Sequence, residues 1–289
     1  MKKKIIFICR SSSIYFVPEN LIPLNFIKLG YEVIEIKFDK MSYADVEKTL
    51  YLNNDADYIF TYGRGCFPAL FFILKHIYIP KIIWMPSIIT DSPNAMDIVR
   101  NYLSCYDIVY TTLPTEITLY KKLGINAKPL FSAIHEDFYK SLDIEKDIEI
   151  GFFGRMHYNS RKKLVDFVSE KYNIYSEFSE TKYIELINRT KINLNVGYFD
   201  FGLPNRVFDT LGCGGFLLTQ KYINEDNILE DGKHLVYFTY SDIYDKIKYY
   251  LDYPEERKKI AKQGQDEVLK KHTYKNRIEI INKDLNFII

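Results

Sequence analysis

Arg206 and Asp209 are the residues whose types and spacing most directly suggest chemistry. They stand three positions apart in the stretch NRVFDTLGCGGFLLTQ, residues 205–220. Residues three apart on a helix lie on nearly the same face. A helix that starts near Asn205 would offer unpaired amides to a phosphate, with Arg206 beside them. A carboxylate at Asp209 can accept both hydroxyls of a ribose. The alternative is an exposed ion pair between the two side chains on a helix that ends in a glycine cap.

A second pair of arginines follows the apolar run IEIGFFG, residues 148–154. Arg155 comes directly after this predicted strand, and Arg161 stands at the start of the next predicted helix. The guanidinium group suits phosphate because its N–H groups donate in pairs. We therefore expect both arginines to contribute to a diphosphate site. The alternative is that Arg161 and the lysines beside it form only a solvated helix start.

Two residues are candidates for the general base that would accept a proton from an acceptor hydroxyl. Asp91 follows the apolar stretch IIWMPSIIT, and His135 stands in the polar segment SAIHEDF. An aspartate before Ser-Pro is also typical of a turn or a helix cap. A single histidine is also common as a structural residue. The stretch YGRGC, residues 62–66, could cradle a phosphate through Arg64, but a lone GxG is weak evidence.

Asp55 and Asp57 resemble the metal-binding DxD motif of GT-A transferases. That motif needs its carboxylates after a buried strand. Here the apolar run YIF follows Asp57, so the pair stands before the predicted strand, at the wrong end. The sequence therefore predicts no metal site.

Length and composition indicate an ordinary globular protein of two domains. The chain has 289 residues, of which 47% are apolar and 27% charged, and its net charge is +1. This balance gives no global field that would recruit nucleic acid or a membrane surface. Four widely spaced cysteines, without a CxxC pair, are typical of reduced thiols in a cytoplasmic protein.

No segment reads as a signal peptide or a membrane span. The start MKKKIIFICRSSS has only five apolar residues before Arg10, too few for the core of a signal peptide. The later run CFPALFFIL is about half the length that a bilayer requires. We expect a soluble protein with no integral membrane segment.

Short apolar runs alternate with segments of helical period along most of the chain, which predicts βαβ units and parallel sheets. The expected strands lie at 5–9, 31–37, 57–63, 81–86, 106–112, 127–131, 148–154, 173–178, 192–197 and 215–220. Ser42 with Asp45 predicts a helix start, and Pro254 predicts a first helical turn. The alternation pauses in the polar stretch 132–147.

This pause predicts two Rossmann-like domains and a helical tail. We expect a first domain at 1–140, a second at 141–270, and a closing helix at 271–289 that packs back on the first domain. Ligands of open parallel sheets bind at the carboxyl ends of the strands. Two such sheets predict a site in a cleft between the domains.

Three stretches of the second half resemble one family closely. They are IGFFGRMHYNSRKKL, NRVFDTLGCGGFLLTQ and the long segment from EDGKHLVYF to HTYKNR. These resemble the C-terminal half of CgeB-like glycosyltransferases, which belong to the group-1, GT-B-type transferases. The similarity covers about 120 residues, and the first half resembles the family more loosely through IIWMPSIITDSP, YDIVYTT and YKKLG.

The resemblance implies a GT-B fold, a nucleotide-sugar donor held mainly by the second domain, and no metal or other cofactor. It places Arg161 at the family's arginine position and Asp209 where the family usually has Glu. Asp is one methylene shorter but keeps the charge. The wider family's paired-glutamate motif is incomplete, because its first Glu falls at Phe201, beside Asp200.

Together these observations predict a metal-independent glycosyltransferase. It would move a hexose or related sugar from a nucleoside diphosphate sugar, UDP-sugar in preference to GDP-sugar, to a hydroxyl of a protein, a glycan or a small molecule. One alternative is a nucleotide-sugar epimerase or hydrolase on the same double-Rossmann plan. Another is a sugar-binding protein without catalysis.

Overall fold

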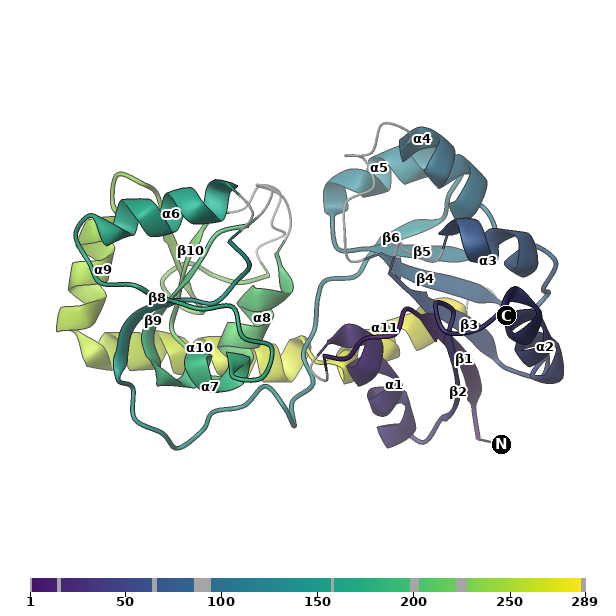
Figure 1. Cartoon of the computed structure of the whole chain (residues 1–289), viewed down its shortest axis with the longest axis horizontal. Helices are drawn as coiled ribbons and strands as arrows, with labels where there is room; N and C mark the ends of the chain where they lie inside the picture. The colour runs from purple at the N-terminus through teal and green to yellow at the C-terminus, as the bar shows by residue number, and fades with distance from the viewer. Residues whose placement is uncertain are drawn as a thin grey trace. The chain divides into compact units, whose positions relative to one another are not determined.

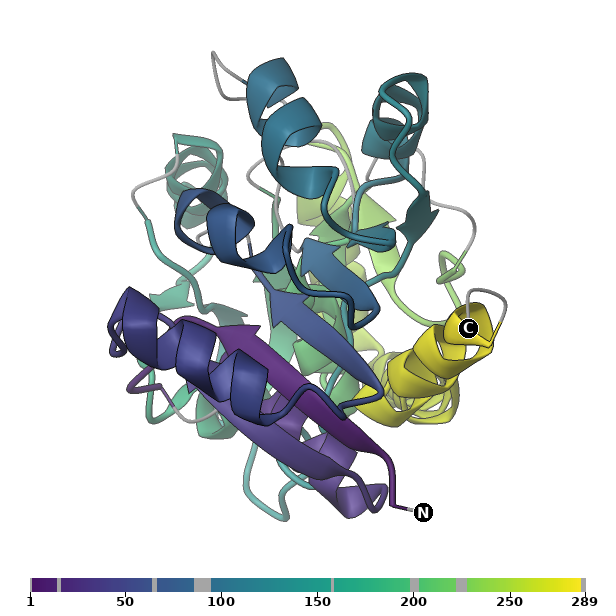
Figure 2. The same ribbon diagram turned by 90° about the vertical axis from the view of Figure 1, so that its right-hand side faces the viewer.

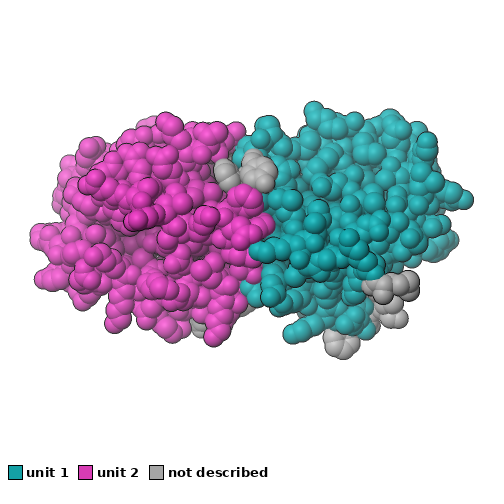
Figure 3. Space-filling view, turned by 90° about the horizontal axis from the view of Figure 1, so that it is seen from below, with its two compact units in different colours: residues 1–131, 274–289 teal, residues 132–273 magenta. Residues whose placement is uncertain are grey.

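The computed structural model describes residues 2–14, 17–63, 67–85, 95–156, 159–197, 203–221 and 228–286. The chain divides into two compact α/β units (Figures 1 and 3). Unit 1 comprises Met1–Phe131 and Tyr274–Ile289, and unit 2 comprises Ser132–Thr273. Each unit is built on one sheet whose strands are all parallel.

Unit 1 contains a six-stranded sheet in the order β2-β1-β3-β4-β5-β6. Its strands are β1 (Lys4–Cys9), β2 (Glu32–Lys37), β3 (Tyr58–Tyr62), β4 (Lys81–Met85), β5 (Ile108–Thr111) and β6 (Ala127–Pro129). The helices are α1 (Pro18–Lys28), α2 (Tyr43–Leu52), α3 (Phe67–Leu74), α4 (Ala95–Ile98), the π-helical turn η2 (Val99–Leu103), α5 (Pro114–Lys122) and α11 (Tyr274–Leu285).

Both faces of the unit 1 sheet are covered by helices, which is why its central strands are apolar throughout. On one face Ile6 and Ile8 of β1 share a buried cluster with residues of α2, α3 and α5. On the other face the side chains are largely aromatic: Phe26 of α1 packs edge-on against Phe60 of β3. The closing helix α11 lies beside α1 on this face (Figures 1 and 2).

Unit 2 contains a five-stranded sheet in the order β11-β10-β9-β7-β8. Its strands are β7 (Ile148–Phe152), β8 (Tyr175–Ser176), β9 (Thr190–Asn195), β10 (Leu217–Gln220) and β11 (Val236–Phe238). Its helices are α6 (Asn159–Ser169), α7 (Tyr183–Arg189), α8 (Asn205–Gly212), α9 (Ile243–Asp252) and α10 (Pro254–Lys271).

Strand β9 shows how the two faces of this sheet differ. Ile192 and Leu194 point into an apolar cluster with residues of α6, α9 and α10. Successive side chains of a strand point to opposite faces, so Asn193 and Asn195 face the side where α7 and α8 lie. The Asn193 amide reaches the Ile187 carbonyl of α7 at 3.4 Å. Both asparagines are buried, so this face has a polar interior.

The two glycines after α8 allow the abrupt change from helix to strand that the sequence suggested. Gly214 has φ +67°, a left-handed conformation that glycine adopts without strain. The Gly215 amide donates to the Thr210 carbonyl at 2.9 Å, the bond that closes a Schellman cap. A Cβ on Gly215 would come within 3.0 Å of the Asn193 side chain. The second glycine is therefore required by close packing.

The segment 132–140 belongs to unit 2, whereas the sequence suggested that it ends the first domain. Although this segment is rich in charged residues, three of its apolar residues, Ala133, Ile134 and Tyr139, are buried. Ile134 and Tyr139 pack against Gly212 at the end of α8. The functional roles expected for each domain and the cleft between them remain predictions.

Several local predictions are confirmed. Ser42 caps α2 by accepting the Asp45 amide at 3.1 Å, and Pro254 begins α10. The short edge strand β11 was not foreseen, because HLVYFTY resembles the end of a loop as much as a strand. Among the described residues, no helix combines the length and apolar character needed to cross a membrane.

Candidate functional site

The side chain of Arg206 reaches from the first turn of α8 to the carboxyl ends of two strands. Its Nη1 donates to Asn195 Oδ1 at 3.1 Å. The guanidinium carbon lies 5.2 Å from the centre of the Phe152 ring, within cation–π range. In the described part of the chain, these contacts leave most of its five N–H donors unused and pair it with no carboxylate.

The absence of a side chain at Gly154 leaves room for the Arg206 guanidinium. A Cβ built on Gly154 would lie 2.3 Å from Arg206 Nη2 and 2.7 Å from the guanidinium carbon. Such contacts are far inside van der Waals separation. The loop after β7 therefore passes directly against Arg206, and only glycine permits this approach without moving the arginine.

Asp209 is buried on the same helix and does not pair with Arg206. The carboxylate accepts a hydrogen bond from the Tyr183 hydroxyl at 3.2 Å, and the residue is 8% exposed. Burial raises the pKa of Asp209 to about 7, against the hydrogen bond from Tyr183 and the charge of Arg206, which lower it. The alternative of an exposed ion pair between Arg206 and Asp209 is therefore wrong.

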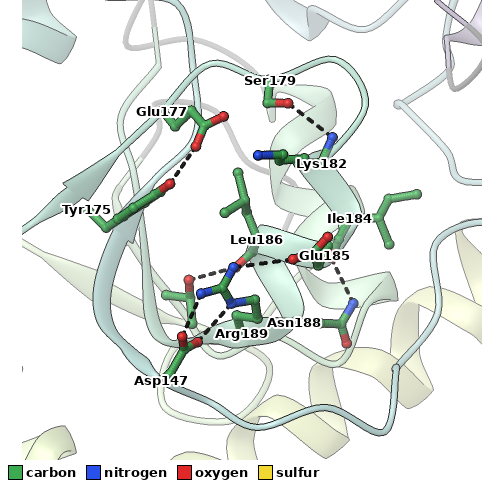
Figure 4. Close-up of polar contacts among 11 residues, drawn as sticks. Asp147, Tyr175, Glu177, Ser179, Lys182, Ile184, Glu185, Leu186, Asn188 and Arg189 are labelled. Atoms are coloured by element: carbon green, nitrogen blue, oxygen red, sulfur yellow. Dashed lines mark hydrogen bonds and ion pairs between the residues drawn. The ribbon is translucent and has the colours of Figure 1, made fainter.

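Helix α7 positions Tyr183, its first residue. Arg189 at the other end of α7 makes a two-pronged ion pair with Asp147, with N–O distances of 2.9 and 2.5 Å, and also reaches Glu185 (Figure 4). Asn188 accepts the Leu142 amide at 2.9 Å. These contacts tie α7 to the start of β7 and to the segment that precedes it, so the phenol is held beside Asp209.

A buried polar network lies behind Arg206. The Asn195 amide donates to Thr219 Oγ1 of β10 at 3.0 Å, while its oxygen receives Arg206. Asn195 and Thr219 are both 0% exposed. Asn195 of β9, which is itself bonded to Thr219 of β10, thus holds the Arg206 guanidinium in position.

Asn205 stands at the exposed start of α8. Its Oδ1 lies 2.5 Å from Ser132 Oγ, which donates to it. The residue before it, Pro204, makes no side-chain cap. The first amides of α8 therefore have no side-chain acceptor at the cap position, which fits a helix start that receives an anion.

Arg155 and Arg161 form a second group beside the first. Arg161 Nη1 donates to the Arg155 carbonyl at 3.1 Å. The Arg155 guanidinium carbon lies 4.9 Å from the Phe178 ring centre, and its Nη2 lies 3.7 Å from Glu180. Arg155 directly follows Gly154, so both groups border the same loop at the carboxyl end of β7.

Of the two candidates for a general base, His135 lies among the described residues. His135 is 4% exposed, its Nδ1 accepts the Asp137 amide at 3.3 Å, and its ring packs against Phe138. This burial favours the structural alternative for His135. Asp91 and Arg64 lie outside the described residues.

Asp55 and Asp57 stand before β3, at the amino edge of the unit 1 sheet. Lys4 binds both: its ammonium lies 2.8 Å from Asp55, and its amide donates to Asp57 at 2.7 Å. Within the ranges that the structure describes, no group of three or more His, Cys, Asp or Glu side chains is arranged to hold a metal ion.

Sequence reasoning missed two residues of the site, Asn195 and Tyr183. For Asn195 a signal exists, since INLNVG places polar residues on alternate positions of an otherwise apolar strand. A polar side chain at the carboxyl end of such a strand points to a site. Tyr183 gives no comparable signal, because it stands 26 positions from its partner Asp209.

The site presents a cation and an anion, each bonded to a neutral group: Arg206 to Asn195, and Asp209 to the Tyr183 hydroxyl. A phosphate would find the free donors of Arg206, and a pair of hydroxyls would find the carboxylate of Asp209. Both are at the carboxyl edge of a parallel sheet, where ligands of such sheets bind. The geometry is suited to a nucleotide.

Comparison with known proteins agrees with this class. Residues 135–283, just over half of the chain, match a family described as glycosyl transferase-like. The chain belongs to this glycosyl transferase-like family, and the prediction that it is a glycosyltransferase enzyme is confirmed. No curated protein sequence matches the chain at a significant level.

Solved structures extend the likeness to the whole chain. Anabaena Alr3699/HepE, solved in complex with UDP, is 13% identical with a TM-score of 0.68 and covers 98% of this chain and 99% of its own. Sucrose-phosphate synthase from Thermosynechococcus elongatus is 8% identical with a TM-score of 0.68, covering 99% of both chains. The T4 phage BGT, in complex with its UDP-glucose substrate, is 13% identical with a TM-score of 0.65, covering 98% of this chain and 99% of its own. The GT-B fold prediction is confirmed.

Proposed function

We propose that this chain is a CgeB-like glycosyltransferase that uses a nucleoside diphosphate sugar, UDP-sugar in preference to GDP-sugar, without a metal ion. Its acceptor is a hydroxyl group of a protein, a glycan or a small molecule. The observation that carries the proposal is the arrangement on α8, where Arg206 and Asp209 lie one turn apart and have separate neutral partners.

In this proposal Arg206 binds the diphosphate together with the first amides of α8, and Asp209 accepts the ribose hydroxyls. Charge-assisted hydrogen bonds of this kind contribute about 1.5–3 kcal/mol each. Arg161 and Arg155 border the same loop and supply further donors as the leaving diphosphate gains charge. The UDP and UDP-glucose complexes of the structurally similar proteins support a uridine nucleotide.

The proposal assigns the donor to unit 2 and the acceptor to unit 1. The helix α11 belongs by its contacts to unit 1, in line with a tail that completes that unit. A cytoplasmic location is retained with the proposal, on the free thiols of Cys9, Cys105 and Cys213. The general base in this proposal is Asp91 or His135.

Calorimetric titration of the full chain with UDP, GDP and uridine, in buffer containing EDTA, tests the proposal. We expect UDP to bind more tightly than GDP, and both more tightly than uridine, because the diphosphate supplies most of the charged contacts. Binding that requires added Mg²⁺ or Mn²⁺ contradicts metal independence. Turnover of UDP-glucose without an acceptor favours the epimerase or hydrolase alternative instead.

A further inference from the structure

The sheet of unit 2 has a second charged feature at its opposite edge. A cavity of about 190 Å³ is lined by residues that include Lys146, Lys191, Phe216, Arg257 and Lys262. Lys146 precedes β7, Lys191 stands near the start of β9, and Phe216 comes just before β10. Because the strands are parallel, this cavity lies at their amino ends, away from Arg206 and Asp209.

Arg257 is the buried cation of this cavity. The residue is 8% exposed, and its Nη1 donates to the Tyr250 carbonyl. In the part of the chain that the structure describes, it makes no ion pair and no other side-chain hydrogen bond. Loss of water lowers the pKa of Arg257. A guanidinium seldom lies buried without a carboxylate unless another anion is at hand.

Lys146 adds a second charge, for which the described residues provide no acidic partner. Its ammonium donates to the Asn188 carbonyl at 2.7 Å and to the Thr190 carbonyl at 3.2 Å. Loss of water, together with the charge of Arg257, lowers the pKa of Lys146. Two cations thus line one cavity, and among the residues that the structure describes their side chains bond to carbonyl oxygens alone.

The rim of the cavity also carries lysines, two of which have acidic partners. Lys262 pairs with Asp266, and Lys191 lies 3.6 Å from Glu149, both on exposed surface. Asp266 and Glu149 are not among the lining residues, so the charged residues of the lining are all cations. Phe216, whose ring packs at a tilt against that of Tyr250 with ring centres 4.6 Å apart, adds an apolar residue to the lining.

We propose that this cavity is a second anion site, which binds the phosphate group of a small phosphorylated molecule or free phosphate. Its volume is below the roughly 300–1,000 Å³ of pockets that enclose drug-sized ligands, so it suits a phosphate group better than a whole nucleotide. The guanidinium of Arg257 is the central donor, and the ammonium groups of Lys146 and Lys191 complete the site. This site is independent of the donor site proposed above.

The test is an amide NMR titration of the full chain with inorganic phosphate, in the presence of saturating UDP. A second titration uses glycerol 3-phosphate, and a third uses sodium chloride at equal ionic strength. We expect saturable shifts at Gly214, Phe216 and Lys191 with phosphate and not with chloride. Tighter binding of glycerol 3-phosphate assigns the site to phosphate esters, and tighter binding of phosphate assigns it to the free ion.

Two variants make the result specific. Arg257→Gln keeps an amide donor for the Tyr250 carbonyl but removes the charge, and we expect phosphate binding to weaken about tenfold or more. Lys262→Ala removes a rim charge and should weaken it about twofold to threefold. Lys248→Ala is the matched control, because Lys248 is also an exposed lysine that pairs with an aspartate four residues on, outside the cavity.

The proposal is overturned if phosphate shifts are spread over surface lysines, if chloride reproduces them, or if the Arg257→Gln variant binds phosphate as well as the native chain. If UDP fails to bind, the donor site proposal fails by itself. The phosphate titration and its variants can still be read without UDP.

Discussion

The carboxyl edge and the amino edge of the unit 2 sheet, where its parallel strands end and begin, differ in the charged side chains that they carry. At the carboxyl edge, a cation and an anion lie one helical turn apart, and each is held by a neutral partner: Arg206 by Asn195 and Asp209 by Tyr183. At the amino edge, Arg257 and Lys146 are both cations, and within the described ranges their side chains donate to backbone carbonyls alone. One edge offers both signs of charge, and the other offers only one.

This difference indicates what each edge can recognise. An ion pair between Arg206 and Asp209 would satisfy both groups and leave little for a ligand. Their separation costs the unliganded chain free energy, since the buried Asp209 carboxylate and the partly buried Arg206 guanidinium form no ion pair with each other. A ligand with a diphosphate and a diol would provide partners for both Arg206 and Asp209. At the amino edge an anion alone would compensate the charges of Arg257 and Lys146.

The largest expected effect comes from removing the cation at the carboxyl edge. Arg206→Ala should weaken UDP binding roughly tenfold to hundredfold, the equivalent of one charge-assisted contact of about 1.5–3 kcal/mol. Uridine should lose far less, because it has no phosphate. Calorimetry with both ligands measures the difference.

Lys248→Ala serves as the control for this variant, because it also removes a cation from unit 2 but breaks an exposed pair with Asp252 that has no part in the donor site. UDP affinity should remain near the native value there. Equal losses for UDP and uridine in the Arg206 variant would show that Arg206 supports the fold and does not read phosphate.

The anion at the same edge should make donor binding depend on pH. With the pKa of Asp209 near 7, the carboxylate is mostly protonated at pH 6 and mostly ionised at pH 8. Ribose hydroxyls bind better to the ionised form, so UDP affinity should rise about tenfold over this range. Asp209→Asn should abolish the rise, because Asn does not titrate. An unchanged pH profile in the variant would assign the titration to another group.

The same shift predicts an effect on the stability of the unliganded chain. The pKa of Asp209 is raised above its unfolded value of about 3.9, so the native state binds the extra proton between these two values. Stability is then greatest at low pH and falls as the pH rises towards 7. At pH 8 the Asp209→Asn variant should be more stable than the native chain by up to about 4 kcal/mol. Urea unfolding at pH 5 and pH 8 measures this gain, which should be less than half as large at pH 5 and should vanish only below about pH 4, where the carboxyl group is protonated in both states.

The two edges also show how far sequence reasoning reaches. The alternation of strands and helices predicted domains with parallel sheets, and the glycines after α8 predicted the end of the helix that carries Arg206, because both depend on local periodicity and backbone conformation. The GT-B fold itself was implied by the family resemblance. The partners of Arg206 and Asp209 depend on contacts between distant segments, which local patterns do not contain. The basic cavity around Arg257 was missed for the same reason, since its residues are scattered from 141 to 265.

A smaller effect is expected from crowding the arginine without removing it. Gly154→Ala places a methyl group where Arg206 Nη2 now lies. The guanidinium is the end of a flexible side chain, so it can move aside at modest cost and the fold should survive. UDP affinity should fall several-fold, while phosphate binding at the amino edge should not change. If UDP binds normally, the observed position of Arg206 is not the one used for phosphate.

The smallest expected effect concerns the phenol that holds the carboxylate. Tyr183→Phe removes the hydrogen bond that lowers the pKa of Asp209, so this pKa should rise further. A hydrogen bond to a charged group contributes about 1.5–3 kcal/mol, and part of it is replaced by water, so the midpoint of UDP affinity should move to a pH about one unit higher. At pH 7 the affinity should then fall about threefold to fivefold, whereas at pH 9 the two proteins should bind equally. A loss that is the same at every pH would mean that Tyr183 only fills space beside α8, and the separation of Arg206 from Asp209 would then owe nothing to the phenol.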